Sequence, residues 1–103
     1  MSQIKEITPQ QVEEKIKQNE DITVIDVRED EEVAQGMVPN AKHIRLADIP
    51  QKVEELPKEQ EYVMVCRSGR RSMNAAEFMQ GKGFSKVQNM EGGMLKWDGE
   101  LVF

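Results

Sequence analysis

The sequence predicts an α/β domain built around a mainly parallel sheet. Two nearly continuous apolar runs, residues 22–27 (ITVIDV) and 62–65 (YVMV), have the length and composition of strands that are buried on both faces, as parallel sheets require. Segments with helical patterns separate the strands, and such alternation is typical of βα units. With 103 residues, the chain is expected to form a single domain, residues 1–103.

The first expected helix has a strong start signal. Thr8 can serve as the N-cap, Pro9 fits the first helical position, and Gln11 completes a capping box. We expect this helix to end near Asn19, before the buried strand over residues 22–27.

The next elements are short. An acidic helix is expected over residues 29–35, because Gly36 follows it as a stop signal. Residues 43–46 then predict a brief strand. Asp48 is expected to cap a further helix that runs through Val53.

The second half begins with the apolar strand over residues 62–65. A helical pattern follows from about residue 71 and ends near Gly81. Residues 85–88 predict a last strand, and residues 92–97 predict a short helical turn.

The charge distribution favours a small anionic ligand. The net charge is −5, which argues against nucleic acid or an acidic membrane as a partner, because both require a basic surface. Residues 62–73 differ from the rest, since they contain three arginines and no acid. We therefore expect a concentrated cationic site on an acidic protein, with no nucleic-acid or membrane partner.

The cysteine content and the first residues suggest a compartment. One cysteine cannot form an internal disulfide, and a single free thiol suits a reducing environment. The opening MSQIKEITPQ lacks the features of a signal peptide, and no run of eighteen apolar residues occurs. We expect a cytoplasmic protein and, by default, a monomer.

The sole cysteine follows the second apolar strand directly, in the segment CRSGRRS. Ligands of parallel sheets bind at the carboxyl ends of strands, and Cys66 is placed at one. A thiol reacts as the thiolate, whose formation is favoured beside cations or at a helix N-terminus. The alternative is that Cys66 is a small buried hydrophobe beside solvated arginines. The cationic surroundings favour Cys66 as the catalytic nucleophile.

The rest of this loop supplies candidate binding groups. A glycine permits a tight turn that points successive backbone N–H groups inward, and serine hydroxyls can add donors or cap the following helix. Arginine side chains offer charge and planar donors that suit a sulfonate or thiosulfonate. The candidate binding residues are Arg67, Ser68, Gly69, Arg70, Arg71 and Ser72.

No metal or cofactor is expected. With one cysteine and one histidine, a zinc site would lack ligands. The acidic run over residues 29–32 does not fit a calcium loop, because Arg28 occupies a ligand position. Asp26 and Arg28 are instead expected to tie the end of their strand to neighbouring loops.

Four segments form a recognisable set: residues 24–29 (VIDVRE), 36–41 (GMVPNA), 66–72 (CRSGRRS) and 90–97 (MEGGMLKW). Together they are similar to the motifs of single-domain rhodanese-like sulfurtransferases, and the resemblance covers nearly the whole length of the chain. Met37 and Asn40 depart from the family pattern, which usually has histidine and glycine there. The resemblance implies a five-stranded parallel sheet flanked by helices and a persulfide on Cys66.

The resemblance also implies a thiosulfate sulfurtransferase reaction in two steps. The Cys66 thiolate attacks the outer sulfur of a thiosulfate-like donor, sulfite leaves, and a thiophilic acceptor then attacks the persulfide. Loop amides and arginines would stabilise the anions, so no histidine base is needed. The expected partners are a small anionic sulfur donor and a thiol or cyanide acceptor, or a sulfur-relay protein.

Two other functions remain open. Cysteine-dependent phosphatases and arsenate reductases on this scaffold need Cys-x5-Arg, but Ser72 follows five intervening residues and Arg71 only four. The shorter loop should crowd a phosphate. The domain could also be a protein-to-protein sulfur relay or a regulatory binding module with little thiosulfate turnover. The physiological donor and acceptor, and the arginine that binds the donor, are not encoded in any motif.

Overall fold

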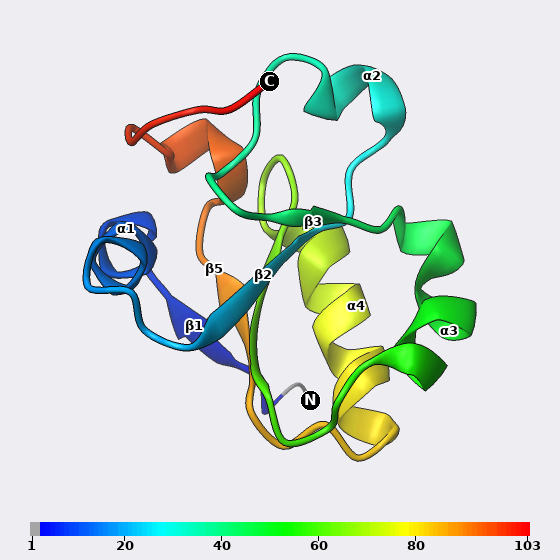
Figure 1. Ribbon diagram of the computed structural model, residues 1–103. Coiled ribbons are helices and arrows are strands. Elements are labelled where there is room, and N and C mark those ends of the chain that lie inside the picture. The colour runs from blue at the N-terminus through cyan, green and yellow to red at the C-terminus, as the bar shows by residue number, and fades with distance from the viewer. Residues whose placement is uncertain (1–2) are drawn as a thin grey trace.

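The computed structural model describes residues 3–103 and contains a five-stranded sheet with the order β1-β5-β4-β2-β3 (Figure 1). Every neighbouring pair is parallel. The expected α/β class with a parallel five-stranded sheet is therefore confirmed. The strands are β1 (Lys5–Ile7), β2 (Ile22–Asp26), β3 (Lys42–His43), β4 (Glu61–Val65) and β5 (Val87–Met90).

Helices cover both faces of this sheet (Figure 1). One face packs against α3 and α4, and the other packs against α1 and the turn after β5. The short α2 follows β2 at the carboxyl edge of the sheet. The helices are α1 (Pro9–Lys17), α2 (Asp30–Val33), α3 (Ile49–Lys52) and α4 (Arg70–Gly81), with 3-10 turns at Leu46–Asp48, Val53–Glu55 and Gly93–Lys96.

The central position of β4 in the sheet explains why residues 62–65 are all apolar. Tyr62 and Met64 belong to the core under α4, whereas Val63 and Val65 belong to the core under α1. All four side chains are almost fully buried. A strand covered on both faces has no solvent side on which polar residues could alternate.

Of the two predicted helix caps, the side-chain cap at Thr8 is present and the one at Asp48 is not. The capping box of α1 is present, since the Gln11 amide donates to Thr8 Oγ1 at 3.1 Å and the Thr8 amide donates to Gln11 Oε1 at 3.0 Å. Asp48 occupies the N-cap position of α3 as expected, but its side chain does not cap the helix. Its carboxylate accepts from Arg45 Nε at 3.2 Å and makes no capping bond to α3.

Three strands differ from the sequence expectation. The last strand, expected over residues 85–88, lies two positions later at Val87–Met90. The strand expected over residues 43–46 is shorter and ends at His43, because the chain turns into a 3-10 helix at Leu46. The amides of Ile44 and Leu46 still donate to carbonyls at the end of β2. The edge strand β1 has only three residues, Lys5–Ile7, too few for a periodic signal.

In residues 3–103, no helix is both long and apolar enough to span a membrane.

Candidate active site

Cys66 directly follows the carboxyl end of β4. The chain then loops into α4 (Figure 1). Its side chain is almost fully buried, with 1% of the residue exposed. The Gly69 amide donates to Sγ across 3.1 Å, and the Ser72 hydroxyl lies 3.3 Å from Sγ. The sulfur therefore sits beneath the first turn of a helix and faces hydrogen-bond donors.

The turn that aims these donors depends on Gly69. Its φ of +96° lies in the left-handed region that favours glycine. A Cβ atom there would lie 3.3 Å from the Gly92 nitrogen and 3.4 Å from the Met90 carbonyl oxygen. The Cys66 loop is thus packed tightly against the segment that follows β5.

The segment after β5 also forms backbone hydrogen bonds with the start of the Cys66 loop. The Met94 amide donates to the Cys66 carbonyl at 2.9 Å, and the Leu95 amide donates to the Arg67 carbonyl at 3.0 Å. Gly93 makes this approach possible, because a Cβ would lie 2.5 Å from both carbonyl oxygens. The Gly-Gly motif, Gly92 and Gly93, therefore supports the Cys66 loop directly.

The pKa of the Cys66 thiol is lowered in this environment. Burial alone would raise it, because the charged thiolate loses solvation. Hydrogen bonds from the Ser72 hydroxyl and from the amides of Ser72, Gly69 and Ser68 outweigh that effect. The loop amides thus favour the thiolate, the reactive form of a thiol.

The three loop arginines have different environments. Arg71 forms a two-point ion pair with Glu32 of α2, at 2.9 and 2.8 Å. Arg67 lines a surface cleft of about 340 Å³ together with Glu32 and Leu95. Arg70 is exposed at the first position of α4. Within residues 3–103, Arg67 and Arg70 have no ion-pair partner, so they are the loop cations available to an anion.

The Arg71–Glu32 pair predicts a pH-dependent contribution to stability. Hydrogen bonds from Arg71 lower the pKa of Glu32 from its usual 4.5 to about 2. A lowered carboxyl pKa stabilises the fold above the unfolded value and loses this effect as the pH falls through the folded value. We expect the free energy of unfolding of Glu32→Gln to fall below wild type by about 1 kcal/mol or less above pH ~4.5. The difference should shrink as the pH falls and vanish below pH ~2, as urea unfolding at several pH values would show. A difference that stays constant with pH would contradict this prediction.

Asp26 and Arg28 tie the end of β2 to its surroundings, as expected. The Asp26 carboxylate is fully buried and accepts from Arg28 Nε at 2.9 Å and from its terminal nitrogen at 2.8 Å. Arg28 also donates to the carbonyls of Gly36 and Glu32. This buried ion pair therefore fixes α2, which in turn presents Glu32 to Arg71.

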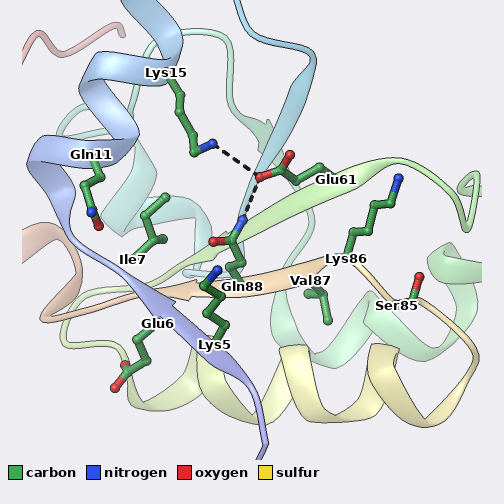
Figure 2. A pocket seen from close by; sticks show the side chains of 10 residues that line it. All are labelled: Lys5, Glu6, Ile7, Gln11, Lys15, Glu61, Ser85, Lys86, Val87 and Gln88. Atoms are coloured by element: carbon green, nitrogen blue, oxygen red, sulfur yellow. Dashed lines mark hydrogen bonds and ion pairs between the residues drawn. The ribbon is translucent and has the colours of Figure 1, made fainter.

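A larger cavity lies at the opposite end of the sheet. Figure 2 shows this cavity of about 430 Å³ at the amino ends of β1, β4 and β5. Glu61 accepts there from Gln88 at 2.7 Å and pairs with Lys15 at 3.6 Å. The cavity does not include Cys66, and ligands of parallel sheets bind at the carboxyl ends of strands.

Three polar residues near the loop were missed from the sequence. Glu32 belongs to the acidic run over residues 29–32, where no pattern distinguishes it from its neighbours, yet it pairs with Arg71. Asn89 contacts both Gly69 and Ser72, and Glu6 contacts Asn89. The one available signal was an amide side chain, Asn89, three positions before the pair Gly92 and Gly93. Residues 3–103 contain no cluster of three or more His, Cys, Asp or Glu side chains that could hold a metal.

Comparison with known proteins gives a consistent result. Residues 8–100 match the model of the rhodanese-like domain. The chain is 55% identical over 98 residues to YtwF of Bacillus subtilis, whose assignment as a sulfurtransferase is provisional; the match covers 95% of this chain and 94% of that protein. It is 30% identical over 97 residues to the thiosulfate sulfurtransferase GlpE of Pseudomonas putida, covering 94% and 87%. A rhodanese-like domain protein from Staphylococcus aureus superposes with a TM-score of 0.89 at 36% identity, covering 97% and 98%.

Proposed function

Because this chain belongs to the rhodanese-like domain family, whose members include sulfurtransferases, we propose that it transfers sulfane sulfur from a thiosulfate-like donor to a thiophilic acceptor through a persulfide on Cys66. The observation that carries the proposal is the Cys66 sulfur beneath the turn into α4, where it faces the Gly69 amide and the Ser72 hydroxyl. Such donors stabilise an anionic sulfur without any transfer of a proton.

In the first step, the Cys66 thiolate attacks the outer sulfur of the donor. The sulfur–sulfur bond of thiosulfate breaks, and its electron pair leaves with sulfite. The negative charge moves from Sγ to the outer sulfur of the new persulfide. The amides of Ser68, Gly69 and Ser72 favour an anion at the base of the loop, and Arg67 and Arg70 favour the dianionic donor.

In the second step, a nucleophilic acceptor such as cyanide or a thiolate attacks the outer sulfur. The bond between the two sulfurs breaks, and the electron pair returns to Cys66 Sγ as a thiolate. The donors that lower the pKa of Cys66 also stabilise this leaving group. The same hydrogen bonds therefore serve both halves of the cycle.

The arginines provide a test of donor recognition. We expect thiocyanate formation from thiosulfate and cyanide, with a KM for thiosulfate that rises about tenfold or more in Arg67→Ala and Arg70→Ala, since a charged hydrogen bond contributes about 1.5–3 kcal/mol. Arg71→Ala should raise the KM less, because Glu32 already neutralises its guanidinium.

The matched control is Lys82→Ala. Lys82 is a cation at the opposite end of α4, and its Nζ lies 5.5 Å from the centre of the Phe78 ring. Its removal should leave the KM unchanged. An equal rise in KM for Lys82→Ala and Arg67→Ala would mean that general charge, not the loop, attracts the donor. Failure to form thiocyanate while a protein persulfide donor still loads Cys66 would favour the relay function.

A further inference from the structure

A buried polar network joins β5 to the Cys66 loop. Asn89 of β5 is 1% exposed, and its Nδ2 donates to Glu6 Oε2 at 3.1 Å and to the Gly69 carbonyl at 3.0 Å. Its Oδ1 accepts from the Ser72 hydroxyl at 2.5 Å. The Ser72 oxygen also lies 3.3 Å from Cys66 Sγ. One amide thus contacts both the turn and the hydroxyl that face the nucleophile.

The network leaves one choice open, namely the direction of the Ser72 proton. The carboxylate of Glu6 and the carbonyl of Gly69 are both acceptors, so they fix the amide of Asn89 with its oxygen toward Ser72. A serine hydroxyl has one proton to donate, yet Ser72 faces two acceptors, Asn89 Oδ1 and Cys66 Sγ. It cannot satisfy both with full strength.

We propose that Asn89 is a positioning residue that sets the direction of the Ser72 hydroxyl: toward Asn89 while Cys66 Sγ is neutral, and toward Cys66 once Sγ carries charge. A neutral thiol can donate its own proton to the Ser72 oxygen, which leaves the hydroxyl proton on Asn89. A thiolate cannot donate and is a stronger, charged acceptor, so it draws the hydroxyl proton away from the amide.

The catalytic consequence rests on the proposed sulfur transfer. In the persulfide the charge resides on the outer sulfur, Sγ is neutral, and the Ser72 hydroxyl returns to Asn89. When the acceptor breaks the sulfur–sulfur bond, charge reappears on Sγ and the hydroxyl turns back to it. The Ser72 hydroxyl therefore donates to Cys66 Sγ while Sγ is charged and to Asn89 Oδ1 while Sγ is neutral. Its buried proton thus has an acceptor at every stage.

The charged groups around the network are the same before and after Ser72→Ala within each background used below. These groups come from every element packed against the network. The loop and α4 contribute Arg67, Arg70 and Arg71, and α2 contributes Glu32. The remaining groups are the Asp26–Arg28 pair at the end of β2, Glu6 on β1, and Glu91 and Lys96 after β5. Their effects on the titration of Cys66 cancel when the effect of Ser72→Ala is compared between two backgrounds.

The test is a double-mutant cycle read by alkylation of the thiol. Cys66 is the only cysteine, so its rate of reaction with iodoacetamide as a function of pH gives the pKa of this thiol alone. In the wild-type background Ser72→Ala should raise the midpoint only modestly. In the Asn89→Leu background, where Sγ is the remaining acceptor for Ser72, the same change should raise the midpoint by roughly one pH unit more.

A second variant tests the opposite direction. Asn89→Asp, made together with Glu6→Gln so that two carboxylates do not face each other, keeps an acceptor of the same size and strengthens it with charge. Ser72→Ala should then shift the midpoint by less than in wild type. An Asn89 that merely supports the loop would give the same Ser72→Ala shift in every background, and that result would overturn the proposal. Alkylation needs no sulfur donor, so a failure of this cycle is distinguishable from a failure of sulfur transfer.

Discussion

Gly93→Ala is expected to disable the Cys66 loop. Gly93 has φ of +59°, and an added Cβ would lie 2.5 Å from the carbonyl oxygens of Cys66 and Arg67. These same carbonyls accept from the amides of Met94 and Leu95, so the clash would separate the two segments at the nucleophile. Left-handed backbone and overpacking together should cost about 2–4 kcal/mol of stability.

The functional loss should exceed the loss of stability. At a temperature where the variant remains folded, we expect sulfur transfer to fall by at least about tenfold, because the donors would no longer point at Sγ. Urea unfolding and thiocyanate formation measure the two effects separately.

Gly81→Ala is the matched control for this substitution. Gly81 is the last residue of α4, and a Cβ there would meet no atom within 4 Å. Alanine should stabilise the protein by about 0.5–1 kcal/mol and leave transfer unchanged. If Gly93→Ala behaved like Gly81→Ala, the close contact between the Gly-Gly segment and the loop would be wrong.

Asp26→Ala is expected to have the largest effect on stability. The variant would leave the Arg28 guanidinium buried, at 6% exposure, without the carboxylate that holds it by three side-chain hydrogen bonds. Removing one partner of a buried ion pair costs about 3–5 kcal/mol. The loss should extend to the site, because Arg28 also binds the carbonyls that fix α2.

An exposed pair of the same chemistry provides the comparison. Asp48 pairs with Arg45 at 3.2 Å, but both side chains are about 40% exposed. Asp48→Ala should cost far less than Asp26→Ala, since solvent already screens that pair. Equal losses for Asp26→Ala and Asp48→Ala in urea unfolding would contradict the structural role assigned to the buried pair.

The central strands and the nucleophile could be predicted because each has a local cause. An apolar run such as residues 62–65 needs burial on both faces, and Cys66 directly follows it. The capping box at Thr8 is likewise a short-range interaction. Such features depend on neighbours along the chain, so the sequence pattern is sufficient to locate them.

The support of the site could not be predicted in this way, because it comes from residues far apart in sequence. Asn89 reaches Gly69 across twenty positions, and Glu6 reaches Asn89 across 83. The partner of Arg71 is likewise distant, since Glu32 lies 39 positions away. From the sequence, all three loop arginines were equal candidates for binding the donor. Arg71 differs from the other two only because α2 packs against the loop and supplies its partner, Glu32.

The measurement that tests the central claim most directly is the intact mass of the purified protein after incubation with thiosulfate. We expect wild type to gain the mass of one sulfur atom, to lose it again when cyanide is added, and Cys66→Ser to gain nothing. The same gain in Cys66→Ser, or no gain in wild type with either thiosulfate or a cysteine-desulfurase donor, would contradict a persulfide on Cys66.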